Sequence, residues 1–286
     1  MSGRRFLRAL TVAALLAVSL SASAEGDAQQ GAIPVLIYHE IVTGDREPGE
    51  TVIALDRFEE QMRYLATEGY ETLSIDELVA VMRRERPAPP KAVVLTFDDG
   101  WKNVLNAVPV LDRYRMKASF WIITGAGIGQ DYLEWSDIVG LAKNPRFQIE
   151  SHTVSHPWDP ADNLVTWLAN PSPGKDAAAA RAELTGSKAT LESRLGRRVD
   201  SLAWPVGWYT EELVQLAKDA GYRAVLTAED GANAPGDDPF HIKRVFVDGA
   251  CGMASFRAVL TRPAYRPCQT SGHSTHGHTP PSLSER

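Results

Sequence analysis

The stretch VVLTFDDG, residues 93–100, places two acids and a glycine directly after a run of apolar residues. A short apolar run that ends in polar turn residues is typical of a strand buried in a parallel sheet. The same rhythm recurs along the chain and predicts seven strands, at residues 34–38, 93–97, 119–123, 147–151, 201–204, 223–227 and 242–246.

Helical patterns lie between these apolar runs, at residues 105–115, 136–143, 177–195 and 211–220. Two further helices are expected before residue 90, because Asp56 with Glu59 and Ser74 with Glu77 have the spacing of a capping box. Alternating strands and helices predict an α/β fold with a parallel sheet covered by helices. Seven such units favour a distorted β/α barrel of about seven parallel strands, with a doubly wound open sheet as the alternative.

Three segments differ in composition. Residues 1–24 combine Arg4 and Arg5 with an apolar run at 9–20 and small residues at 22–24, which predicts a signal peptide and export to the periplasm or the exterior. A retained membrane anchor is the weaker alternative, because twelve apolar residues fall short of the roughly 20 that span a bilayer. We therefore expect no membrane span after signal cleavage, a folded domain at 25–266 and a disordered polar tail at 267–286.

Composition and charge narrow the function classes. The chain has 286 residues, of which 44% are hydrophobic and 23% charged, as in a folded globular protein. Its net charge of −6 becomes −9 without residues 1–24, which argues against a nucleic-acid partner. Cys251 and Cys268 are the two cysteines of the chain, and an oxidising compartment would permit a disulfide between them.

Five titratable residues follow the predicted strands: His39, Asp98, Asp99, His152 and His156. Loops after parallel barrel strands share one rim, so we expect these side chains to converge there. Two imidazoles and one carboxylate can hold a divalent metal. The four-residue spacing of the two later histidines predicts a helical turn that points both at one ion. The two adjacent acids on an extended stretch would point apart, leaving one free as a general base for metal-assisted hydrolysis.

Two of these segments carry a family resemblance. TFDDG at 96–100 and SHTVSH at 151–156 resemble the first two motifs of the polysaccharide deacetylase family, also called the NodB-homology or carbohydrate esterase family 4 domain. The resemblance extends to PVLIYHEI at 34–41, to FEEQMRYLATEGYETLSIDEL at 58–78 and to WPVG at 204–207, which are similar to the subgroup that deacetylates poly-β-1,6-N-acetylglucosamine. It implies a NodB-like barrel and an N-deacetylase activity.

The resemblance also implies a role for each matching residue. Asp98 would be the general base that activates the attacking water, and Asp99, His152 and His156 would bind one divalent metal ion. Zinc is the expected metal, with nickel, cobalt or iron as alternatives. His39 would be the general acid for the leaving amine, a role that suits an imidazole near neutral pH. The backbone N–H of Val206, which follows Pro205, would help to stabilise the tetrahedral oxyanion.

The third motif departs from the family pattern. Val206 stands where many members have a tyrosine, and no arginine precedes Pro205 more closely than Arg198. Arg244, in HIKRVFV at 241–247, is our candidate for the missing electrostatic partner of Asp98.

Four tryptophans lie in or beside the predicted rim loops, and flat indole rings could contact a sugar. Trp101 and Trp208 are the better candidates for substrate contact, Trp158 is a further one, and Trp204 is expected in the core.

The substrate expected from the resemblance is a polymer of N-acetylglucosamine, most specifically the biofilm polysaccharide poly-β-1,6-N-acetylglucosamine. Chitooligosaccharide, peptidoglycan and acetyl xylan are alternatives within the same chemistry. A non-catalytic glycan-binding protein of the same fold is an alternative from another class. A glycosidase is disfavoured, because adjacent Asp98 and Asp99 do not easily flank a glycosidic bond at about 5 to 9.5 Å. The sequence leaves the oligomeric state open.

Overall fold

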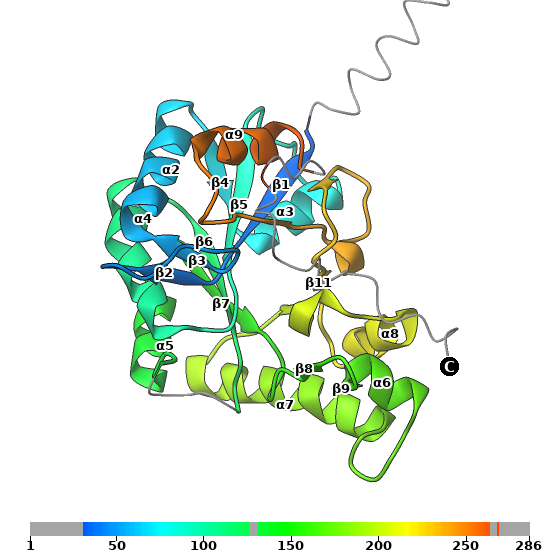
Figure 1. Cartoon of the computed structure of the whole chain (residues 1–286). Helices are drawn as coiled ribbons and strands as arrows, with labels where there is room; N and C mark the ends of the chain where they lie inside the picture. Colours follow the sequence, from blue (N-terminus) through cyan, green and yellow to red (C-terminus); the bar gives the residue numbers. More distant parts are fainter. Residues whose placement is uncertain (1–30, 126–130, 264–267, 269–286) are drawn as a thin grey trace, which may run out of the picture.

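The structure is a computed structural model that describes residues 31–125, 131–263 and 268 (Figure 1). Its strands are β1 Ile33–Tyr38, β2 Glu40–Val42, β3 Val52–Ala54, β4 Glu71–Leu73, β5 Ala92–Phe97, β6 Ala118–Ile122, β7 Phe147–Ser151, β8 Trp158–Asp159, β9 Asp162–Asn163, β10 Ser201–Ala203, β11 Ala224–Leu226, β12 Ala232–Asn233 and β13 Val245–Phe246. Its α-helices are α2 Leu55–Thr67, α3 Ile75–Met82, α4 Val108–Arg113, α5 Trp135–Ala142, α6 Leu164–Ala169, α7 Ala177–Leu195, α8 Glu211–Asp219 and α9 Met253–Thr261. Short 3-10 helices are η1 Lys102–Ala107, η2 Pro205–Gly207 and η3 Pro239–His241. The predicted signal peptide, and the predicted tail apart from Cys268, lie outside the described residues.

The main sheet has the order β11-β10-β7-β6-β5-β1, and neighbouring strands along this path are parallel. Strand β4 pairs with the first half of β5, and β6 pairs with the second half of β5. Strand β12 pairs antiparallel with the first two residues of β1. Six of the seven expected strands are therefore present and parallel along this path, while β4 and β12 are additions to the sheet that the sequence did not indicate.

The segment at 242–246 joins the two ends of this curled sheet. Ile242 forms a parallel bridge with Leu226 of β11, and β13 pairs with β1. The sheet therefore curls into the distorted barrel that the sequence predicts, and the open doubly wound alternative is wrong. Only the last two residues of the predicted strand at 242–246 are regular strand.

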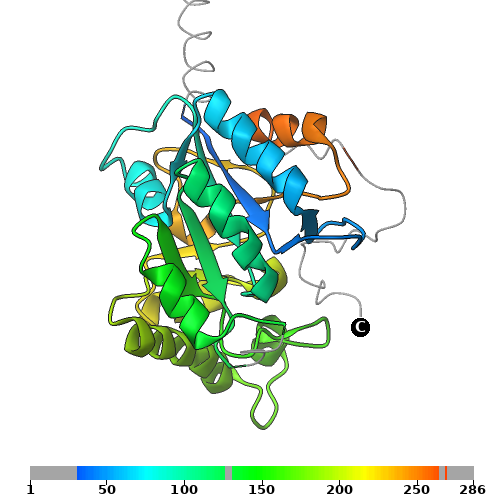
Figure 2. The same ribbon diagram turned by 90° about the vertical axis from the view of Figure 1, so that its left-hand side faces the viewer.

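Two apolar clusters lie on the two faces of the curled sheet. Side chains alternate along each strand, and residues such as Leu95, Phe120 and Ile149 pack in one cluster with α2, α4, α5, α7 and α8. Figure 2 shows α2, α4 and α5 side by side on this outer face. Strand residues whose side chains point to the opposite face, including Val94 and Trp121, pack with α3 in the second cluster, inside the curl.

The helix beginnings only partly follow the predicted caps. Ser74 and Glu77 form the expected capping box at the start of α3. The N-cap of the first helix lies two residues earlier than expected: it is Ala54, which makes no side-chain cap bond, and Asp56 lies in the first turn. Within the residues that the structure describes, no helix is both long enough and apolar enough to cross a membrane.

Candidate active site

The predicted catalytic residues lie where the strands end. His39 directly follows β1, Asp98 directly follows β5, and His152 directly follows β7. The N–H of Asp98 donates to the carbonyl of Tyr38 at 2.9 Å, which holds the ends of β1 and β5 together. The apolar runs set the strand ends, and the parallel register then brings these residues to one rim, as the sequence predicts.

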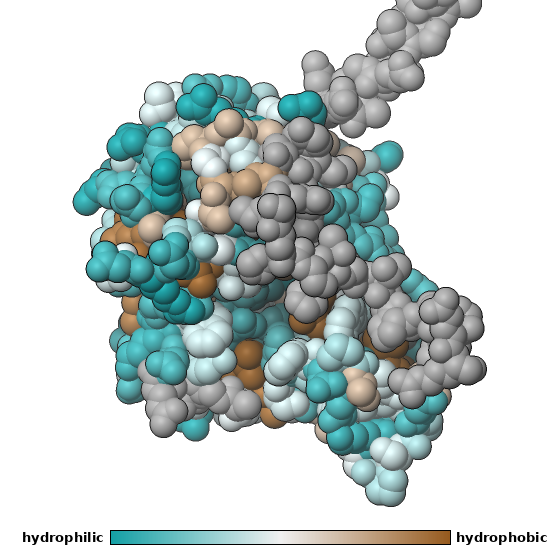
Figure 3. All heavy atoms as spheres, in the orientation of Figure 1, coloured by the Kyte–Doolittle hydropathy of each residue, from teal (hydrophilic) through white to brown (hydrophobic). Residues whose placement is uncertain are grey.

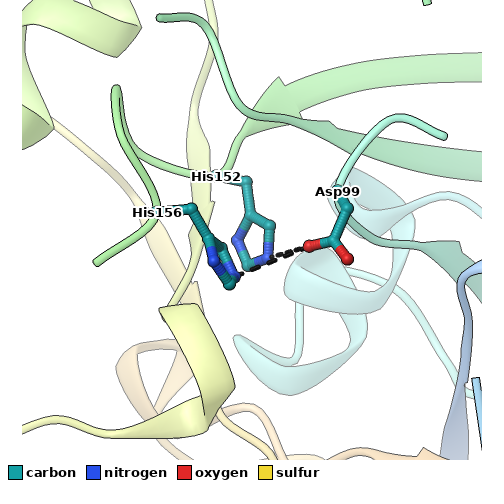
Figure 4. Close-up of side chains that lie close together, drawn as sticks. All are labelled: Asp99, His152 and His156. Atoms are coloured by element: carbon teal, nitrogen blue, oxygen red, sulfur yellow. Dashed lines mark ion pairs between the residues drawn. The ribbon is translucent and has the colours of Figure 1, made fainter. Parts of the chain in front are cut away.

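Asp99, His152 and His156 form a compact group of donor atoms (Figure 4). The Oδ1 atom of Asp99 lies 3.3 Å from Nε2 of His152 and 3.5 Å from Nε2 of His156. One ligand atom from each residue lies within 4.8 Å of the other two. Nδ1 of His152 is 2.8 Å from the carbonyl oxygen of Ala203 and donates to it, which leaves the Nε2 lone pair facing the group. This donor set fits a divalent transition metal.

The two histidines are not on a helix, which corrects the prediction. Residues 152–156 form an irregular loop in which Thr153 and His156 have φ of 67° and 51°. The hydroxyl of Thr153 accepts from the N–H of His156 at 3.0 Å, and this bond shapes the loop. A spacing of four brings the imidazoles together here through a tight turn.

A glutamate on α7 braces this loop, and sequence reasoning missed it. One carboxylate oxygen of Glu183 accepts from the N–H groups of Val154 and Ser155, both at 2.8 Å. The other oxygen accepts from the hydroxyl of Ser155 at 2.7 Å. Glu183 is one of several acids in the helix at 177–195, and nothing in the sequence distinguishes it from the others.

The two adjacent aspartates separate because the chain turns between them. Asp99 has a φ of 70° and Gly100 a φ of 80°, so the prediction of an extended pair is wrong. A side chain at Gly100 would lie 3.2 Å from Ile122, and this close approach favours glycine. Asp99 consequently faces the histidines and accepts from Nε1 of Trp101 at 3.0 Å.

Arg244 directly precedes β13, which pairs with β1, and reaches the carboxylate of Asp98 at the end of the next strand, β5. Its Nη1 lies 2.8 Å from Oδ1 of Asp98, and its Nε donates to the carbonyl of Thr227 at 2.7 Å. Both members of this ion pair are buried, with 1% exposure for Arg244 and 4% for Asp98. The structure therefore places Arg244 in the position that sequence reasoning gave it, across 146 residues of chain.

Electrostatics keep the two carboxylates ionised. Burial opposes the charge of Asp98, but the Arg244 guanidinium and His152 outweigh it and hold the pKa of Asp98 below its usual value. Burial likewise opposes the charge of Asp99, while its close contact with His152 and the neighbouring imidazoles holds its pKa far below normal. Burial and the adjacent His152 lower the pKa of His156 to about 4, so His156 is neutral and can act as a ligand near pH 7.

His39 faces the same group. It directly follows Tyr38, whose carbonyl accepts from the N–H of Asp98, and its charge helps to lower the pKa of both aspartates. Its ring stacks on Phe246 with centroids 5.8 Å apart and planes 8° apart. Within the described part of the chain its buried Nδ1 has no hydrogen-bond partner.

The third motif and the tryptophans vary in accessibility. Pro205 is buried, while Val206 is 40% exposed with a φ of 49°. Trp101 is half-buried and stacks on Tyr132, and Trp208 is half-buried against the outer apolar cluster. Trp204 is fully buried, as the sequence predicts.

Cys251 and Cys268 form a disulfide, with Cα atoms 6.0 Å apart. Cys251 precedes α9, and the bond ties residue 268 to the end of the domain that carries β13.

Comparison with known proteins identifies the family. Residues 85–225 match the family model described as polysaccharide deacetylase, and this span contains the aspartate pair and both metal-site histidines. The protein is therefore a deacetylase enzyme. The chain belongs to the polysaccharide deacetylase family, as the motifs predict.

Individual relatives agree with this assignment. The chain is 28% identical over 229 residues to YxkH of Bacillus subtilis, covering 80% of this chain and 76% of that protein. It is 22% identical over 202 residues to a Staphylococcus aureus protein named poly-beta-1,6-N-acetyl-D-glucosamine N-deacetylase, covering 68% and 67% of the two chains. Among solved structures, IcaB from Ammonifex degensii has a similar fold, with a TM-score of 0.70 and 24% identity over 82% of this chain and 98% of that one.

Proposed function

We propose that this deacetylase removes N-acetyl groups from a polymer of N-acetylglucosamine, and that poly-β-1,6-N-acetylglucosamine is its substrate. The observation that carries the proposal is a buried carboxylate, Asp98, paired with Arg244 directly beside the Asp99–His152–His156 group. The name of the Staphylococcus aureus relative and the similarity of the early YH motif to the same subgroup support the choice of polymer.

Each residue has a distinct task in amide hydrolysis. Asp99, His152 and His156 would hold one divalent metal, for which we propose zinc. When bound, such a metal polarises the amide carbonyl and lowers the pKa of water. Asp98 accepts the proton of the attacking water. The Arg244 guanidinium keeps the Asp98 carboxylate ionised, so that it is available as a base.

The remaining steps concern the tetrahedral intermediate. The N–H of Val206 donates to the developing oxyanion, a contact that does not depend on the side chain at this position. His39 donates a proton to the nitrogen, the C–N bond breaks, and acetate and a free sugar amine leave. The stack on Phe246 fixes the plane of the His39 ring for this transfer.

We also propose that the protein acts outside the cytoplasm. The signal-like residues 1–24 and the Cys251–Cys268 disulfide support an exported protein, because disulfides persist in oxidising compartments.

The test is acetate release from purified poly-β-1,6-N-acetylglucosamine, chitooligosaccharide, peptidoglycan and acetyl xylan, with and without a chelator. We expect release from the first polymer, loss with chelator, and recovery with zinc. His39→Ala, Asp98→Asn and His152→Ala should each lose nearly all activity, with metal content falling only for His152→Ala. Greater release from another polymer would overturn the substrate, and shortening of the chain would indicate a glycosidase. Binding without any acetate release would indicate a glycan-binding protein.

A further inference from the structure

Trp158 is an outlier among the tryptophans of the described residues. Its side chain is 63% exposed, whereas Trp121 and Trp204 are fully buried. Proteins usually bury most of a tryptophan, because its large ring gains much from leaving water. Figure 3 shows one face of the molecule, where hydrophilic residues predominate and apolar patches are small and separate. An indole that keeps 63% of its surface in water is therefore a candidate for contact with a ligand.

The position of Trp158 ties it to the active site. It follows the metal-site residue His156 by two positions, so their Cα atoms are at most about 7 Å apart. Val206, the other exposed large hydrophobic residue of the described chain, follows β10, and the Ala203 carbonyl of β10 holds His152. The two exposed apolar residues therefore follow, in two different loops, segments that hold the same pair of histidines.

Several hydrogen bonds hold the segment that carries Trp158. Trp158 pairs with Asn163 in the β8–β9 hairpin. Asn163 is 2% exposed; its Nδ2 donates to the carbonyls of Asp159 and Pro160, and its Oδ1 caps α6. Asp162 accepts from Nε1 of Trp167 at 2.6 Å. Because the backbone of this hairpin is already ordered, ligand binding at Trp158 does not have to order the loop that carries it.

The other candidates from the sequence are less free. The Trp101 ring already stacks on Tyr132 at 4.4 Å, and its Nε1 donates to Asp99. Trp208 packs on the outer apolar cluster. Trp158 alone of the three keeps most of its surface in water.

We propose that Trp158 is a stacking platform for the pyranose ring next to the sugar residue that is deacetylated. The inference rests on the proposed function, because it assumes a substrate of more than one sugar. The apolar face of the neighbouring ring covers the indole, while the indole N–H remains able to bond a hydroxyl. The platform makes the enzyme prefer a polymer over a single N-acetylated sugar.

The test compares Trp158→Ala and Trp158→Phe with Asp159→Asn, a neighbouring hairpin variant that leaves the indole in place. With the polymer, Trp158→Ala should raise KM about tenfold while kcat, metal content and thermal stability stay unchanged. Trp158→Phe should keep most of the affinity, and Asp159→Asn all of it. With a single N-acetylated sugar, none of the three variants should change kcat/KM.

Binding without turnover separates this proposal from the proposed function. In an Asp98→Asn background, polymer should change the tryptophan fluorescence, and adding Trp158→Ala should remove both that change and about tenfold of the affinity. This result would support the platform even if the wild type released no acetate. An unchanged KM and affinity in Trp158→Ala would overturn it, as would absence of polymer binding by the Asp98→Asn protein. Equal losses on the single sugar would show a structural role instead.

Discussion

Replacing Glu183 by alanine tests whether the metal site depends on a brace outside it. The carboxylate of Glu183 accepts three hydrogen bonds from residues 154 and 155, which lie between the two histidine ligands. Thr153 and His156 flank these bonds in left-handed conformations that non-glycine residues rarely adopt without support. The brace therefore stabilises a loop that is unfavourable by itself.

The expected magnitude follows from the three bonds. Each bond to a charged acceptor contributes about 1 kcal/mol at a half-exposed position, so the loop loses about 3 kcal/mol of support. Only part of this loss lowers the metal-binding free energy, because a bound ion itself orders His152 and His156. Residues that support ligands typically contribute 10- to 100-fold to metal affinity. We expect the Kd for zinc to rise within that range in Glu183→Ala, which is about 1.4 to 2.7 kcal/mol.

The assay is calorimetric titration of the metal-free protein with zinc, using a competing chelator to bring the affinity into range. Glu192→Ala is the matched control, because Glu192 also lies on α7, accepts from the N–H of Val199 at 3.1 Å and pairs with Lys188. It should change stability but not zinc affinity. An unchanged zinc Kd in Glu183→Ala, or an equal rise in the control, would refute the reasoning.

Three further predictions concern buried charge, pH and the disulfide. Arg244→Met leaves the buried Asp98 carboxylate without its partner, so it should cost about 3 to 5 kcal/mol in unfolding free energy and abolish acetate release while zinc content persists. Denaturant unfolding and metal analysis check this. Burial raises the pKa of Glu150 to about 8, so the unfolded chain releases this proton at lower pH than the folded one, and the protein loses stability as pH rises from about 4.5 to about 8. Glu150→Gln removes that loss and can still accept from the N–H of Ser201; its melting-temperature advantage over wild type should grow across this window and level off above it, and a constant difference would contradict the assignment. Cys251→Ser should lower the unfolding free energy by about 3 kcal/mol, since the closed loop spans 17 residues; reducing agent should then destabilise only the wild type.

The sequence predicts the rim of the barrel well because a simple physical pattern determines it. Apolar runs buried on both faces end where the chain meets water, and polar residues at those ends meet in a parallel sheet. His39, Asp98 and His152 each stand at such an end, so their convergence follows without coordinates. The main core strands are found for the same reason, whereas β8 and β9 have two residues each and no detectable pattern.

The local conformation of the metal loop could not be predicted. A spacing of four fits one helical turn, but the turn at 152–156 depends on tertiary support from Glu183 and on the Thr153 hydroxyl. Thr153 is β-branched, and such a residue gives no sign that it adopts a positive φ. Long-range contacts of this kind lie outside any pattern of nearby residues.

The segment that closes the barrel also completes the active site. Ile242 bridges to β11 and β13 pairs with β1, so residues 242–246 join the two ends of the curled sheet. Between those contacts, Arg244 reaches Asp98, and Phe246 stacks on His39. The proposed base and the proposed acid thus both take a partner from one short segment. Because the guanidinium that pairs with Asp98 comes from this closing segment, the charge of Asp98 depends on barrel closure. Opening that segment would leave Asp98 buried without its counter-charge, so the closed fold and the ionised base stabilise each other.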